Sequence, residues 1–202
     1  FIFDGIIPSI SKLLSKTAPV PVTQLMISLF PNIADVLYDR FTDLADDLVL
    51  NFFLLIIHII VLNGIKNIND DPLLICNLHK SSNSQSTTEI DDKVCQTYSL
   101  AEICSNIAPL SPSFIDVIPE SWASLISLLD PDVFLEKELP FLFLASTAPK
   151  KESRIISLKL ISYLIHLIDL DILFSPSCQI ISRLASDISG TVRCLVPVLI
   201  AQ

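Results

Sequence analysis

The sequence predicts an all-α protein built as a series of antiparallel helical hairpins, and three observations support this fold class. The long apolar segments exceed the usual length of a β-strand. Only three glycines occur in 202 residues, which leaves few tight turns for β-hairpins. The same pattern occurs at 22–63 and, less strictly, at 132–169. In it, a helix that contains a proline is followed by an acidic turn and then by a long apolar helix. We therefore expect an α-solenoid, in which such hairpins stack in a row.

The chain is more apolar than an ordinary globular domain. Hydrophobic residues make up 51% of it and its mean hydropathy is +0.62, which is high for a domain surrounded by water. The sequence opens on Phe1 and shows no leader-like start. We therefore expect a fragment of a longer superhelix, whose apolar ends would be covered by adjacent repeats.

Charge and cysteine content narrow the classes of partner. A net charge of -9 disfavours nucleic acid, whose phosphates are bound by clustered Lys and Arg. The cysteines form no CxxC pair and have no histidine at zinc-finger spacing. We expect reduced, mostly buried thiols, and hence a cytoplasmic or nuclear location. The five cysteines are Cys76, Cys95, Cys104, Cys178 and Cys194.

Helices are expected along most of the chain, with one polar interruption. Residues 1–63 and 98–202 are predicted as hairpin repeats of one solenoid, and 64–97 as a polar, disordered insertion. Pro31 is expected to kink or interrupt its helix. Pro109, Pro112 and Pro119 are expected to divide 98–129 into short helices. The expected helices are 5–16, 22–41, 45–63, 99–108, 120–129, 132–147, 151–169, 176–186 and 190–201.

The run from Leu48 to Leu62 could cross a membrane or lie inside a protein. It is fifteen residues long and broken only by Asn51 and His58, whereas a spanning helix needs about 20 apolar residues. Asp47, Asn51 and His58 fall on one narrow stripe of a helical wheel. We favour a buried helix that touches water along this stripe. A membrane-associated protein, with this run and residues 155–173 in lipid, is the less favoured alternative.

A second helix at 151–169 repeats this design. Its polar arc holds Lys159, Ser162, His166 and Asp169. The opposite side is apolar at the helical period. Two helices of the same design predict that each is packed between neighbouring helices in the same way. The apolar side holds Ile156, Leu160, Leu164 and Leu167.

The turn "LASDISGTVRC" carries a spacing that resembles the HEAT repeat. Asp187 lies five residues before Val192, and Arg193 follows directly. Arg154 and Arg193 are 39 residues apart, within the period of such armadillo-like repeats. We expect Asp187 and Arg193 to stack into a ladder that links turns, rather than to bind a ligand.

Longer segments resemble the cullin-associated and neddylation-dissociated family. They are "YDRFTDLADDLVLNFFLLI", with Arg40, Phe41, Asp43, Asp47 and Phe53, then "PKKESRIISLKLISYLIHL" and "QIISRLASDIS". The resemblance implies a non-enzymatic scaffold that binds a cullin and its RING subunit, without a cofactor, and promotes exchange of substrate receptors. A HEAT scaffold in nuclear transport or in chromatin and transcription regulation is the alternative.

Catalytic motifs are missing from the sequence. It has no GxSxG, no phosphate-binding glycine loop and no HExxH. His58, His79 and His166 are far apart, and we interpret His58 and His166 as side chains at the water edge of their helices. The sequence thus predicts no catalytic, cofactor-binding, metal or small-molecule site, and does not show which face binds a protein.

Three further side chains have structural interpretations. Cys178 and Cys194 lie on consecutive expected helices, and buried free thiols are favoured over a metal or redox site. Trp122 is expected to anchor a short helix in the core, and the alternative is an exposed aromatic residue at a partner interface.

Overall fold

The described part of the protein is all-α. The computed structural model describes residues 7–40, 46–62, 106–129, 131–167 and 170–201. Within these ranges there are eight helices and no sheet, and the one β-type contact is a bridge between Ser15 and Ile107. The helices are α1 (Ile7–Leu13), α2 (Val20–Arg40), α3 (Asp46–Leu62), α8 (Phe114–Ile126), α9 (Pro131–Thr147), α10 (Lys151–Leu167), α11 (Leu170–Ala185) and α12 (Gly190–Ile200).

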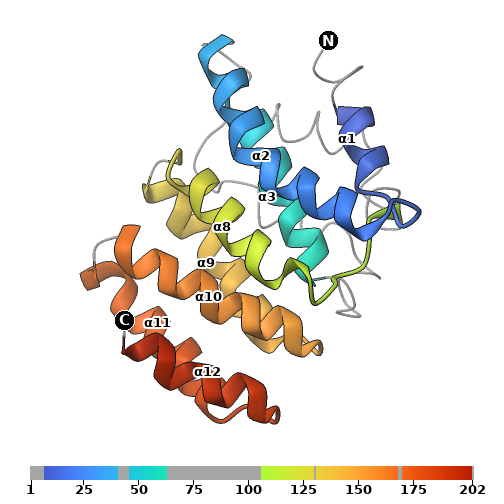
Figure 1. Cartoon of the computed structure of the whole chain (residues 1–202). Helices are drawn as coiled ribbons and strands as arrows, with labels where there is room; N and C mark the ends of the chain where they lie inside the picture. Colours follow the sequence, from blue (N-terminus) through green and yellow to red (C-terminus); the bar gives the residue numbers. More distant parts are fainter. Residues whose placement is uncertain (1–6, 41–45, 63–105, 130, 168–169, 202) are drawn as a thin grey trace.

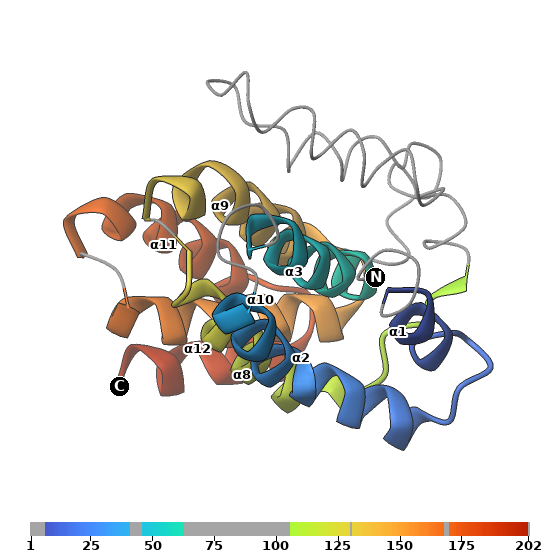
Figure 2. The same cartoon turned by 90° about the horizontal axis from the view of Figure 1, so that it is seen from above.

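The helices lie in two rows (Figures 1 and 2). One row holds α2, α8, α10 and α12, each in contact with the next. The other row holds α3, α9 and α11, which also contact one another in that order. Three pairs of neighbouring helices contact each other across the two rows, with one helix of each pair in each row. These pairs are α2 with α3, α9 with α10 and α11 with α12. The pair α11–α12 forms one end of the array, the lower end in Figure 1.

Most expected helix boundaries agree with the structure, but Pro31 does not interrupt its helix and Pro119 does not separate two helices. α2 continues from Val20 to Arg40 through Pro31, and α8 begins at Phe114, well before the expected start, and continues through Pro119. A proline inside a helix removes one backbone hydrogen bond, and packing of the flanking residues offsets that loss. Phe30 beside Pro31, for example, is fully buried and stacks on Phe53 at 4.5 Å between ring centroids. The expected insertion at 64–97 lies outside the described residues.

Every side chain of α3 that the structure describes is buried. Leu50 and every residue from Phe52 to Leu62 are buried, because α2, α8, α9 and α10 all contact this helix. The interpretation of the apolar run as a buried helix is therefore confirmed from Leu50 onward. None of the helices in the described ranges is both long enough and apolar enough to cross a membrane.

α10 departs from its expected pattern at both ends. At its start, six consecutive residues from Ser153 to Leu158 are buried, since α10 contacts α8, α9, α11, α12 and α3. At its end, Leu167 is exposed although it was expected on the apolar side. His166 is exposed, as expected, and Lys159 and Ser162 are half-buried. Asp169 lies outside the described residues.

Candidate functional site

The first polar cluster of the structure is enclosed in the core and joins three helices. Glu138 of α9 accepts two hydrogen bonds at the same oxygen, Oε2. His58 Nε2 of α3 lies 2.8 Å from it and Trp122 Nε1 of α8 lies 2.7 Å from it. The His58 ring also stacks on Phe141, at 3.9 Å between ring centroids. All three polar side chains are 0% exposed or nearly so, so the cluster joins α3, α8 and α9 from within.

The structure corrects the interpretation of His58 and confirms that of Trp122. His58 was expected to face water, but α9 covers it and supplies Glu138 as its partner. A buried imidazole needs such a partner, because an unpaired polar group in the core costs about 1–3 kcal/mol. Trp122 anchors α8 in the core, as expected, and its ring N–H binds Glu138. The second carboxylate oxygen of Glu138, Oε1, is buried and has no hydrogen-bond partner among the described residues.

Glu138 was missed by the sequence analysis, although a signal was present. In "PDVFLEKELPFLFLAST" this glutamate lies four residues after Phe134 and three before Phe141. That spacing puts it on the same helix face as two aromatic residues. A carboxylate on an apolar face is the pattern expected for a buried, paired acid. What the sequence could not supply was the identity of the donors, which come from α3 and α8.

A second polar cluster links the turns of the two last hairpins. Arg154, near the start of α10, binds the Asp187 carboxylate with two nitrogens: Nε lies 2.6 Å from Oδ2 and Nη2 lies 3.0 Å from Oδ1. Both side chains are more than nine-tenths buried. The remaining nitrogen, Arg154 Nη1, donates to the carbonyls of Ala148 and Pro149 in the turn before α10. This two-bond pair of Arg154 and Asp187 is called the turn rung below.

The Arg193 side chain also contacts this turn, but it binds backbone carbonyls instead of a carboxylate. Its Nη1 donates to the carbonyl oxygens of Asp187 and Ile188, at 2.6 Å and 3.2 Å. Arg154 and Asp187 link the two turns, whereas Arg193, which was expected to take part in this link, bonds to the carbonyls of its own turn. The sequence placed Asp187 and Arg193 at one turn correctly, but it did not show that the carboxylate binds the arginine of the preceding hairpin.

The turn rung sets the ionisation of Asp187. Burial by itself would raise the pKa of the Asp187 carboxyl. The hydrogen bonds from Arg154 and from the Ser189 N–H, and the positive charges of Arg154 and Arg193, outweigh burial and hold the pKa below its usual value of 3.8. Asp187 is thus a carboxylate at neutral pH, and its charge is matched by a guanidinium in a nearly dry environment.

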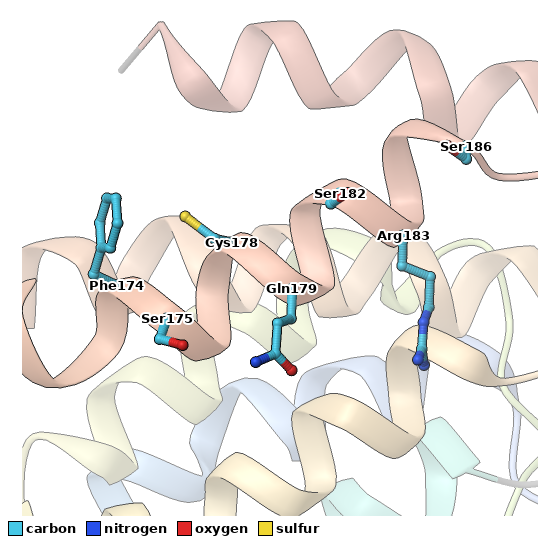
Figure 3. Close-up of a pocket in the computed structure, with 7 residues that line it drawn as sticks. All are labelled: Phe174, Ser175, Cys178, Gln179, Ser182, Arg183 and Ser186. Carbon is cyan, nitrogen blue, oxygen red and sulfur yellow. The ribbon is translucent and has the colours of Figure 1, made fainter.

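The outer surface of α11 is an open groove along a single helix. Figure 3 shows Phe174 and Cys178 projecting to one side of the helix and Gln179 and Arg183 to the other. Cys178 and Cys194 are both free and exposed, so the expectation of buried thiols is wrong for these two. They lie on the outer faces of α11 and α12, which no described helix covers. The other cysteines and His79 lie outside the described residues.

In the described ranges, no three side chains of His, Cys, Asp or Glu lie close enough together to hold a metal ion. Comparison of the whole chain with protein-family models, with curated proteins and with solved structures found no match.

Proposed function

We propose that the protein is a non-enzymatic scaffold of HEAT-like helical repeats that binds another protein. The observation that carries this proposal is the repetition of one arginine arrangement. Arg154 and Arg193 are each the fourth residue of their helix, and each donates its Nη1 to the carbonyls six and five residues earlier. Equivalent turns at a period of 39 residues are typical of repeat proteins, which present extended binding surfaces.

An exposed apolar stripe on α2 supports the binding role. Val22, Leu25, Leu29 and Val36 are all exposed, and Leu25 is 61% exposed. Their spacing of three, four and seven residues puts them on one face of the helix. An apolar stripe that remains open to water is typical of a surface that another protein covers. We name these four residues the α2 stripe.

The resemblance to the cullin-associated and neddylation-dissociated family narrows the proposed partner to a cullin with its RING subunit. In this form of the proposal the scaffold binds the cullin and competes with its substrate-adaptor module. Binding of one partner then lowers the affinity of the other by the same factor, because coupling between two sites is reciprocal. The alternative is a HEAT scaffold that acts in nuclear transport or in chromatin and transcription regulation. It keeps the proposed scaffold function and changes only the partner.

The test is direct binding between the purified protein and a cullin–RING complex, measured by biolayer interferometry. We expect binding to the cullin that lacks its ubiquitin-like modification, and at least about tenfold weaker binding by Leu25→Asp, because a desolvated charge is costly in an apolar interface. Ser28→Asp is the matched control. It adds the same charge on an exposed position of α2 outside the α2 stripe, and it should bind normally.

Two results would change the proposal in different ways. Absence of binding to every cullin tested removes the cullin partner and leaves the wider scaffold. That wider form is then tested by affinity purification from cells, in which partners must be lost with Leu25→Asp and retained with Ser28→Asp. Equal recovery with both variants would contradict a binding role for the α2 stripe.

A further inference from the structure

The apolar pattern of the α2 stripe is the same in both directions along the helix. Val22 and Val36 each lie seven residues from Leu29, and Leu25 and Ile33 each lie four residues from it, on opposite sides. Ile33 is half-buried and the other four side chains are exposed. Successive members are three or four residues apart, so all of them lie on one face of the helix. A second α2 that runs in the opposite direction therefore presents apolar side chains at the same heights.

The distribution of charge also favours contact between two copies of the chain at this helix. The chain carries a net charge of -9, so two copies repel each other in most orientations. α2 differs from the rest of the chain, because its first fifteen residues, 20–34, contain no charged side chain. A two-fold pair brings the same surface of each copy together, and so it needs an uncharged surface at its centre. The first two-thirds of α2 provides one.

The position of α2 in the array leaves this face open. α2 ends the row of α2, α8, α10 and α12, and Figure 1 shows it at the end of that row opposite α12. Its main contacts in the described part of the chain are with α1, α3 and α8. Leu25 and Val36 are 61% and 56% exposed, so a second copy can cover them without any change in the core. Pairing about a two-fold axis closes on itself, and so it does not extend the rows of helices.

We propose that two copies of this chain pair through the α2 stripe, with their α2 helices antiparallel and a two-fold axis passing beside Leu29. Leu29 of one copy then packs against Leu29 of the other, Val22 against Val36, and Leu25 against Ile33. A single helix face is a small interface, so this dimer forms reversibly. The pairing covers the surface that the proposed function assigns to another protein. Competition between the second copy and that protein is the consequence, and this consequence alone rests on the proposed function.

Sedimentation equilibrium of the purified chain at increasing concentration measures the pairing. We expect the average mass to rise from the monomer value of 22.4 kDa towards twice that value. Leu29→Asp should raise the dissociation constant of the dimer at least about tenfold, because it places two carboxylates against each other beside the axis. Ser28→Asp is the matched control, since it adds the same charge at an exposed position outside the α2 stripe, and it should change the constant by less than about twofold. Helical circular dichroism shows that both variants fold.

Disulfide crosslinking tests the direction and register of the pair. In a chain whose two exposed cysteines are replaced by serine, Leu29→Cys should form a disulfide between two copies in a glutathione buffer, because the two Cα atoms face each other across the axis. Leu25→Cys is the control. In the antiparallel pair, the two copies of residue 25 lie about 12 Å apart along the helix axis, too far for a disulfide. A mixture of Val22→Cys and Val36→Cys chains should form the mixed disulfide, and mass spectrometry identifies the linked peptides.

An average mass that stays at the monomer value at every concentration would overturn the inference. Equal crosslinking at residues 25 and 29 would overturn it too, because an antiparallel pair centred on Leu29 allows only the second. These measurements use only the purified chain, so they are independent of the binding assay on cullins. A dimer whose crosslink at residue 29 leaves partner binding unchanged would keep this pairing and remove the binding role of the α2 stripe. A monomer that binds its partner through the stripe would do the reverse.

Discussion

At the scale of single residues, the two buried acids do different work. Glu138 has two ring nitrogens, His58 Nε2 and Trp122 Nε1, on one oxygen, and so it fixes side chains inside the core. Asp187 has a guanidinium partner and a backbone N–H, and so it fixes two turns to each other. Each acid is buried only because its partners compensate the loss of water.

Replacement of Glu138 by alanine should strongly destabilise the protein. Glu138→Ala leaves the ring N–H of Trp122 and the His58 ring buried without their acceptor, and the expected loss is about 3 kcal/mol of unfolding free energy. Urea denaturation measures it. The same substitution at the exposed Glu120 should cost less than about 0.5 kcal/mol. Equal effects at both positions would contradict the role of the buried cluster.

The turn rung should make stability depend on pH in the acid range. The pKa of Asp187 is lowered on folding, below 3.8. Its ionised form therefore adds stability that is complete above the ordinary pKa and is lost as the pH falls through the folded pKa. Asp187→Asn should lower the unfolding free energy at pH 7 by about 2 kcal/mol, and the difference from wild type should shrink below about pH 4.

Urea unfolding at a series of pH values between 7 and 2.5 measures this difference. Asp116→Asn is the control, because Asp116 pairs with Lys159 at the surface and its side chain is 78% exposed; exposed pairs contribute little. A difference between wild type and Asp187→Asn that stays constant down to the lowest pH would contradict the assigned ionisation.

At the scale of helices, serines bring neighbouring elements together. Ser153 Oγ of α10 donates to the Val61 carbonyl of α3 at 2.5 Å, and Ser121 Oγ of α8 donates to the Ile27 carbonyl of α2 at 2.8 Å. Both serines are buried. A small hydroxyl side chain lets a neighbouring helix approach closely and satisfies its carbonyl. The sequence shows two ordinary serines at these positions, and only the packing gives them this role.

The size of Ser153 should therefore matter as much as its hydroxyl group. Ser153→Ala removes one hydrogen bond and should cost about 1 kcal/mol. Ser153→Leu adds bulk between α10 and α3 and should cost more, about 3 kcal/mol. Thermal or urea unfolding gives both values. At the exposed Ser124 of α8, neither change should cost more than about 0.5 kcal/mol. A leucine at 153 that is tolerated like alanine would contradict the close approach of α10 to α3.

At the scale of the whole molecule, one hydrophobic cluster extends from α1 to α12. It includes Ile10 near one end of the described chain and Val196 near the other, and it passes through Trp122. Consecutive elements share this core rather than having separate ones. We therefore expect the described helices to unfold together, as a single cooperative unit.

A destabilising substitution in the hairpin α11–α12 should shift the unfolding midpoint reported by Trp122 fluorescence. Leu184 of α11 is fully buried, so Leu184→Ala should lower the unfolding free energy by about 3 kcal/mol. The urea midpoint should shift equally in Trp122 fluorescence and in helical circular dichroism. Phe174→Ala, at an exposed position of the same helix, should shift neither. A fluorescence midpoint that does not move with Leu184→Ala would show that α11–α12 unfolds independently.

Helix content was readable from the sequence because it depends on local patterns. Apolar residues at the helical period, acidic turns and the scarcity of glycine predicted the eight described helices to within a few residues, apart from the starts of α8 and α11. The start of α8 was misjudged because Pro119 was treated as a break, and α11 begins before Pro176 and continues through it, since packing can override a single lost hydrogen bond. The turn with Asp187 and Arg193 was also found, since its spacing lies within eleven residues of sequence.

Pairings between distant residues were decided by the tertiary structure alone. His58 and Glu138 are 80 residues apart, and Arg154 and Asp187 are 33 apart. No periodicity encodes such pairs, because a helical wheel shows which face is polar but not which helix will cover it. The burial of His58 and the exposure of Cys178 follow from that difference. By itself the sequence determined which segments are helices. The order of the helices in two rows determined which polar groups meet and which remain open, because contacts between rows depend on the whole packed array.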